Sequence, residues 1–87
     1  MKVKTLVLGP LETNTYLIEK DGKCLIVDPA YDFLRIKKEI GDLNLEGILI
    51  THYHFDHIGA LEELNKHYNV PIYDYNSNNN FNFEIIH

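Results

Sequence analysis

Apolar and polar residues alternate in short runs along the first third of the chain, as they do in strands with one buried face. The runs are rich in β-branched, aromatic and other apolar residues and occupy residues 3–8, 13–19 and 23–27. Asp21-Gly22 stands between the second and third runs, and Asp-Gly between two apolar segments strongly favours a hairpin. Gly9-Pro10 and Asp28-Pro29 end the first and third runs. The pattern therefore predicts three strands at the start of the chain.

After the third strand, the apolar residues recur with the helical period of about 3.6 residues. In residues 31–40 they stand at positions 33, 36 and 40, with Asp32 near the start and Gly41 just past the end, where capping residues are expected. Residues 58–68 show the same period, and their apolar stripe consists of Ile58, Leu61, Leu64 and Tyr68. Two helices are therefore predicted.

Three more apolar segments predict strands between and after the helices. Residues 45–50 are almost continuously apolar, as in a strand covered on both faces. Residues 70–73 form a short strand in which Pro71 favours an edge or an early position, and residues 81–85 alternate after an Asn-rich loop. The order of elements predicts an α/β fold, with one mixed sheet and two helices in a single domain over residues 1–87. Residues 23–50 form its strand–helix–strand unit, with parallel strands.

Four metal-binding side chains follow the strand at 45–50 directly: His52, His54, Asp56 and His57. The loops beyond the carboxyl ends of parallel strands are where sites form. His52 and His54 are two residues apart, so in an extended segment their side chains leave on the same side and can bind one ion together. Asp56 and His57 point differently, at the turn into the helix.

A pair of metal ions accommodates these four groups better than a single tetrahedral ion does. We predict His52 and His54 on one ion and Asp56 and His57 on the other. Imidazole and carboxylate without thiolate suit zinc first, with iron or manganese as alternatives. Two ions that share a water molecule make it acidic enough to act as a hydroxide nucleophile at neutral pH, so the cluster indicates metal-assisted hydrolysis.

Other interpretations of the histidines explain the pattern less well. Exposed polar residues in a loop would not need three His and an Asp within six positions after a buried strand. A structural zinc site ranks last, because such sites are usually rich in cysteine and this chain has one. His67 lies ten residues beyond His57 along the second helix, where a solvated or helix-end histidine is the better interpretation.

Asp28 is a further candidate because the parallel strands 23–27 and 45–50 end at the same edge of the sheet. Asp28 and His52 then leave the sheet together, and a carboxylate there can hydrogen-bond the far nitrogen of a ligand imidazole. An ordinary Asp-Pro turn explains the same residues, and the spacing alone leaves both interpretations open.

The amino-acid composition limits which binding partners and which cellular location are expected. The net charge of −5 excludes a nucleic-acid backbone as the expected partner. No apolar run approaches the length of a membrane span. Cys24 has no partner for an internal disulfide and lies in an apolar strand, which favours a small buried side chain over a reactive thiol. We therefore expect a cytoplasmic protein that acts on a small molecule.

Three segments resemble the metallo-β-lactamase superfamily, particularly its glyoxalase II-like members (hydroxyacylglutathione hydrolases). They are THYHFDHIG at 51–59, NTYLI at 14–18 and IVDP at 26–29, and the likeness extends over residues 1–75. The resemblance implies the N-terminal half of a four-layer αββα sandwich, with two zinc ions at the cluster, Asp56 in the catalytic centre and Asp28 supporting the ligands. It also implies hydrolysis of a thioester of the hydroxyacylglutathione type by a hydroxide between the two metal ions.

The resemblance also implies ligands that this chain does not supply. The family uses a later His, a bridging Asp and a last His, and the chain ends at His87, just before the position of the first of these. Two protein ligands per ion is one fewer than a catalytic zinc site normally has. The alternative is therefore a truncated, non-catalytic fragment that binds metal weakly or associates with another chain. Half a sandwich leaves an apolar sheet face uncovered, which favours a homodimer through that face.

Overall fold

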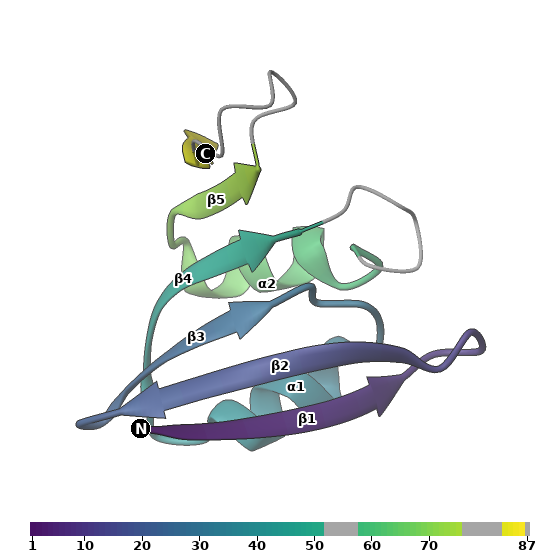
Figure 1. Ribbon diagram of the computed structural model, residues 1–87, viewed down its shortest axis with the longest axis horizontal. Helices are drawn as coiled ribbons and strands as arrows, with labels where there is room; N and C mark the ends of the chain where they lie inside the picture. Colours follow the sequence, from purple (N-terminus) through teal and green to yellow (C-terminus); the bar gives the residue numbers. More distant parts are fainter. Residues whose placement is uncertain (52–57, 76–82, 87) are drawn as a thin grey trace.

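The sheet has six strands in sequence order, as a computed structural model of the chain shows (Figure 1). The structure describes residues 1–51, 58–75 and 83–86. Neighbouring strands are antiparallel from β1 to β3, parallel from β3 to β5, and antiparallel again at the last pair. The elements are β1 (Lys2–Leu8), β2 (Thr13–Lys20), β3 (Lys23–Val27), α1 (Phe33–Ile40), β4 (Asn44–Ile50), α2 (Leu61–Tyr68), β5 (Ile72–Tyr75) and β6 (Phe83–Ile86). The predicted α/β fold with a mixed sheet and two helices is confirmed.

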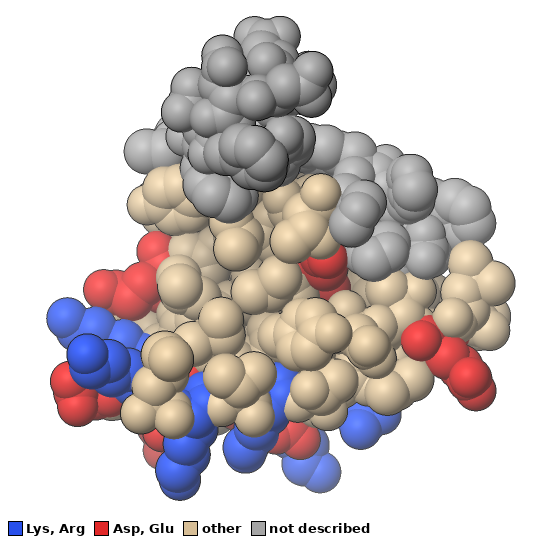
Figure 2. Space-filling model, viewed as in Figure 1, with Lys and Arg blue, Asp and Glu red and all other residues tan. Residues whose placement is uncertain are grey.

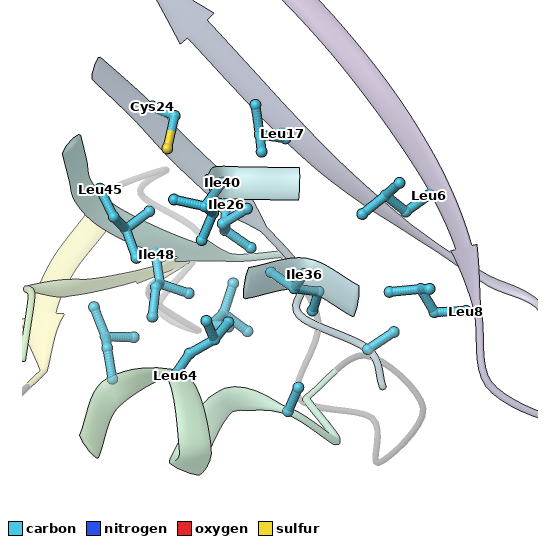
Figure 3. Close-up of a cluster of buried hydrophobic side chains, with 14 residues drawn as sticks. Leu6, Leu8, Leu17, Cys24, Ile26, Ile36, Ile40, Leu45, Ile48 and Leu64 are labelled. Atoms are coloured by element: carbon cyan, nitrogen blue, oxygen red, sulfur yellow. The ribbon is translucent and has the colours of Figure 1, made fainter. Parts of the chain in front are cut away.

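Both helices cover the same face of the sheet and form the core with it (Figures 1 and 3). The buried side chains alternate along the strands, as the period of two predicts, and they meet one stripe of each helix. Ile26 and Ile48 from the central strands pack with Ile36 of α1 and Leu64 of α2, and all four are completely buried. The helical stripes seen in the sequence therefore position the two helices on this face.

The opposite face of the sheet carries apolar side chains that neither helix covers. Val3 and Val7 of β1 point to this side and are 57% and 51% exposed. In the next strands, Ile18 pairs with both Val3 and Leu25, which continues the apolar row across the sheet. Figure 2 shows a mostly uncharged surface over the strands, with Lys and Arg side chains interspersed with Asp and Glu along its lower and left margins. The homodimer expected through this face stays a prediction.

The turns and helix ends follow the local sequence signals. Asp21 and Gly22 have φ of 52° and 78°, the left-handed pair that joins two antiparallel strands tightly. The Asp32 side chain accepts a hydrogen bond from the backbone N–H of Arg35 at 3.2 Å and caps α1. At the other end, Gly41 has φ of 53° and its N–H donates to Lys37. The hairpin and both predicted caps of α1 are confirmed.

Several predicted elements begin later than expected. The first helix begins at Phe33 instead of residue 31, directly after its cap Asp32, and two other elements are shifted by contacts with distant segments. The second helix begins at Leu61 instead of residue 58, because the N–H of Ala60 donates to the carbonyl of Pro29, 2.9 Å away, and residues 58–60 form a turn. The fifth strand runs from Ile72 to Tyr75 instead of 70–73. Pro71 has no N–H to contribute, and it precedes this strand with its carbonyl accepting from Ile48. Both shifts come from backbone contacts between distant segments.

No helix among the described residues has the length and the apolar character that crossing a membrane requires.

Cys24 is the buried small side chain that its sequence context predicted, since it is only 2% exposed. Burial, helped by the negative charges of Glu19 and Glu46, raises the pKa of its thiol from 9.0 to about 11. The folded state thus favours the neutral thiol, whereas the unfolded chain loses the proton at lower pH. Below pH 9 the thiol is protonated in both states, so its contribution to the free energy of unfolding does not change with pH. Between pH 9 and 11 only the unfolded chain loses the proton, and the free energy of unfolding decreases.

We therefore expect the wild-type chain to lose more stability than Cys24→Ala over this interval of pH. Urea unfolding of both proteins at pH 7, 9 and 11 measures the difference, because the two proteins share every other titrating group. The difference includes the effect of Cys24 on Tyr68, whose pKa is raised first by burial and then by the negative charge of the Cys24 thiolate. Parallel pH profiles for the two proteins would contradict the expected role of the buried thiol.

Candidate metal site

Asp28 ends β3 and turns the chain out of the sheet. Its φ of 53° lies in the left-handed region, which Asp tolerates better than most residues do. Its backbone N–H still donates to the carbonyl of Leu49 in β4, at 2.8 Å, so the two parallel strands stay together at their carboxyl ends. The side chain lies inside the protein, and the residue is only 3% exposed. A carboxylate at this depth needs hydrogen-bond donors.

Thr51 supplies two of these donors. Its backbone N–H donates to one carboxylate oxygen of Asp28 at 2.7 Å, and its hydroxyl donates to the other. Thr51 directly precedes His52, the first residue of the predicted metal-binding cluster. Asp28 and Thr51 therefore lie together where the parallel strands β3 and β4 end, whereas the predicted position of His52 beside Asp28 stays a prediction. The predicted hydrogen bond from Asp28 to a ligand imidazole involves residues outside the described part of the chain, so it stays a prediction.

Thr15 fixes the same turn from β2. Its hydroxyl donates to the carbonyl oxygen of Asp28 at 2.6 Å and accepts from the N–H of Ala30 at 3.0 Å. The residue is completely buried on the helix-covered face, between Thr13 and Leu17 in the alternating pattern. Sequence reasoning assigned it no role, although a threonine at a core-facing position of a strand signals a hydroxyl that bonds to backbone.

The chain returns to this turn after the cluster. Ala60 donates from its backbone N–H to the carbonyl of Pro29, and Gly59 lies against Ala30. A Cβ atom at Gly59 would be 2.2 Å from the carbonyl oxygen of Ala30, far inside contact distance. Only glycine permits this approach. Gly59 was part of the motif, but nothing in the pattern along the chain indicates which backbone it approaches.

Residues 28–30 therefore contact the described residues on both sides of the segment 52–57 in the sequence. Asp28 binds Thr51 on one side, while Pro29 and Ala30 meet Ala60 and Gly59 on the other. The four predicted ligands His52, His54, Asp56 and His57 lie within that segment and outside the described residues. In the described ranges, no three side chains of His, Cys, Asp or Glu come together as a metal site.

His67 lies apart from this turn, in the last turn of α2. Its ring makes edge contacts with Tyr68, at a centroid distance of 4.7 Å, and with Phe33 of α1, at 5.6 Å. It is exposed. The prediction of a helix-end histidine is confirmed.

Comparison with known proteins identifies relatives of this chain. Residues 8–77 match the family model described as the metallo-beta-lactamase superfamily. The chain is 37% identical over 83 residues to the "Probable metallo-hydrolase YqgX" of Bacillus subtilis, and 36% identical over 87 residues to the "Hydroxyacylglutathione hydrolase GloC" of Haemophilus influenzae. These alignments cover 93% and 97% of the chain, but 39% and 41% of the relatives. The chain thus spans about two fifths of the length of the curated relatives it matches.

Two solved structures share its fold. The BLEG-1 B3 metallo-beta-lactamase superposes with a TM-score of 0.78 at 34% identity, over 82% of this chain and 35% of that protein. TTHA1623, solved in a di-iron-bound form, superposes with a TM-score of 0.67 at 35% identity, over 79% of this chain and 36% of that protein.

Proposed function

The chain belongs to the metallo-beta-lactamase superfamily, and from this premise we propose that its chemistry is metal-dependent hydrolysis of thioesters of the hydroxyacylglutathione type. One observation supports the proposal above the others. The turn at 28–30 contacts Thr51 on one side, and Gly59 and Ala60 on the other, of a six-residue segment of the sequence that contains three His and one Asp. Such a donor set, held at the carboxyl ends of parallel strands, suits a metal site.

The donor set fits a pair of ions. We assign His52 and His54 to one ion and Asp56 and His57 to the other, with Asp56 in the catalytic centre. Zinc suits imidazole and carboxylate, and the relative TTHA1623 in its di-iron-bound form supports a pair of ions and makes iron the second candidate. When bound, such a pair supplies a hydroxide for attack on a carbonyl carbon at neutral pH.

The residues around the segment position the ligands. Asp28 holds the backbone of Thr51 through its carboxylate, so the residue before His52 cannot move independently of β3. Thr15 holds the carbonyl of Asp28, and thereby fixes the orientation of the turn. Small displacements of metal ligands change affinity and activity strongly, and partners outside the ligand set are typically worth 10- to 100-fold, about the range expected here.

The substrate class rests on the relatives, because the metal ligands do not choose the substrate. GloC of Haemophilus influenzae is named a hydroxyacylglutathione hydrolase and aligns with 97% of this chain, the segment 52–57 included. A thioester carbonyl is also a suitable target for a hydroxide held beside a carboxylate and imidazoles. S-Lactoylglutathione is therefore the first substrate to assay.

We expect the purified chain loaded with zinc or iron to retain metal and to hydrolyse S-lactoylglutathione. His52→Ala and Asp56→Asn should each lower kcat/KM by more than about 100-fold, because they remove ligands instead of the groups that support them. Metal content and the loss of thioester absorbance measure the two effects. His67→Ala is the matched histidine control, and it should leave both unchanged, since His67 packs on Phe33 and Tyr68.

The outcomes separate the proposal from its alternative. Metal retention without thioester cleavage would support a metal-binding, non-catalytic role for these 87 residues. A chain that holds no metal and whose His52→Ala variant behaves like wild type would contradict both the site and the reaction.

A further inference from the structure

A cavity of about 300 Å³ opens beside the turn that follows Asp28. It lies between the β1–β2 hairpin, which supplies Leu8 and Leu11, and the segment after Asp28, which supplies Ala30 and Tyr31. Gly59 completes the described wall, two residues beyond the end of the predicted cluster. The hairpin and the carboxyl ends of β3 and β4 lie at the same end of the sheet, on the right in Figure 1. The cavity volume is at the small end of the range for sites that bind small molecules.

Tyr31 packs against two glycines in the wall of the cavity, Gly9 and Gly59. A Cβ atom at Gly9 would be 3.0 Å from the Cβ of Tyr31, and one at Gly59 would be 3.6 Å from its Cδ1. The Tyr31 ring therefore lies close to the backbone of the hairpin and also close to the backbone that follows the cluster. One side chain of the cavity wall thus contacts both the hairpin and Gly59, which follows the predicted cluster in the sequence.

The described lining is uncharged and mainly apolar. Leu8 forms its buried part, with an exposure of 4%, and Leu11 is 57% exposed beside it. Thr13 and Tyr31 supply the only side-chain polar groups of the described wall. A charged ligand group would lose its hydration there without an opposite charge from these residues to compensate. Burial of an alkyl group, by contrast, is favourable.

We propose that this cavity receives the alkyl part of the acyl group of the thioester substrate. The proposal rests on the proposed function, since it places the acyl side of that substrate. A glutathione thioester has two sides, and glutathione is charged at both ends, which the uncharged wall does not favour. The hydroxyacyl group is the uncharged side, and its alkyl part is apolar. Its carbonyl is the group that must reach the metal site, whose predicted ligands precede Gly59 in the sequence.

A series of glutathione thioesters with acetyl, propionyl, butyryl and hexanoyl groups tests the proposal on the metal-loaded protein. We expect kcat/KM to rise by about fourfold for each added methylene until the cavity is full, which is the fold-change that burial of one CH₂ produces. Leu11→Ala should flatten this dependence by removing part of the wall. Leu34→Ala is the matched control, because Leu34 is also exposed, at 71%, but lies outside the cavity.

A second measurement makes the result independent of catalysis. S-Methyl-, S-propyl- and S-hexylglutathione lack the scissile carbonyl, so their Kd values report binding alone. We expect Kd to fall by about fourfold for each methylene, and the NMR signals of the Leu8, Leu11 and Ala30 methyl groups to shift with the longer chains. Leu11→Ala should weaken binding of the hexyl compound by about fourfold or more, whereas Leu34→Ala should not.

The two measurements distinguish failure of the cavity from failure of the proposed function. Binding that depends on chain length, without hydrolysis of any thioester, would support the cavity and reject the reaction. Hydrolysis with kcat/KM and Kd independent of chain length would retain the reaction and overturn the cavity. Shifts confined to methyl groups elsewhere would overturn it as well.

Discussion

Replacing Asp28 with alanine is expected to lower the free energy of unfolding by about 3 kcal/mol, since hydrogen bonds to a buried charged group each contribute about 1.5–3 kcal/mol. The carboxylate is buried and accepts from both the N–H and the hydroxyl of Thr51. Alanine removes the acceptor of both hydrogen bonds and opens a space at the end of β3. For a domain of this size the melting temperature should fall by more than about 10 °C.

Asp28→Asn separates the carboxylate from the shape of the side chain. The amide keeps one acceptor oxygen for Thr51 but presents a donor where the second oxygen was, so the expected loss is about half of that for alanine. Asp42→Ala is the matched control on an exposed Asp and should change the free energy of unfolding by less than about 0.5 kcal/mol. Urea unfolding monitored by circular dichroism measures all three.

The metal affinity of the same variants provides a second, independent measurement. If Asp28 orients the segment that begins at Thr51, Asp28→Asn should weaken metal binding by about 10-fold or more even where the protein is fully folded. Unchanged metal binding in a folded Asp28→Asn protein would reduce Asp28 to a structural residue of the Asp-Pro turn, the second of the two interpretations that the sequence left open.

The sequence predicted most of the fold because its signals are local. Asp21-Gly22 places the hairpin, and Asp32 and Gly41 delimit α1 within two residues of the apolar period. The errors fall where distant backbones meet. The start of α2 is decided by the contact of Ala60 with Pro29, and the start of β5 by that of Pro71 with Ile48. A pattern along the chain contains neither contact.

The candidate site also contains residues that local sequence signals predict and residues that they do not. The candidate metal ligands are predicted by their type and spacing, and Asp28 by the edge that parallel strands share. Thr15 was missed because its two bonds go to Asp28 and Ala30, thirteen and fifteen residues away, and a threonine in a strand usually needs no such explanation. The cavity was missed because its walls come from three segments that only the folded sheet brings together.

Gly59→Ala is expected to lower the free energy of unfolding by about 3 kcal/mol or more, as severe overpacking against fixed atoms does. The added Cβ would stand 2.2 Å from the carbonyl oxygen of Ala30. That oxygen belongs to the backbone, so no side-chain rotation relieves the clash. The segment must move away, which also breaks the bond from Ala60 to Pro29. Both the stability and the end of the metal-binding segment are then affected.

Gly22→Ala is the control that makes this prediction specific. Gly22 has a φ of 78°, which alanine adopts at a cost of about 1–2 kcal/mol, but a Cβ there meets nothing within 4 Å. Gly59 is not among the residues with positive φ, so a ranking by conformational preference alone would make Gly22→Ala the more damaging change. We expect the reverse order in urea unfolding, together with metal binding at least about 10-fold weaker in Gly59→Ala and unchanged in Gly22→Ala. Equal stabilities, or the order that φ dictates, would show that the turn at 28–30 does not hold the end of the segment as closely as its geometry indicates.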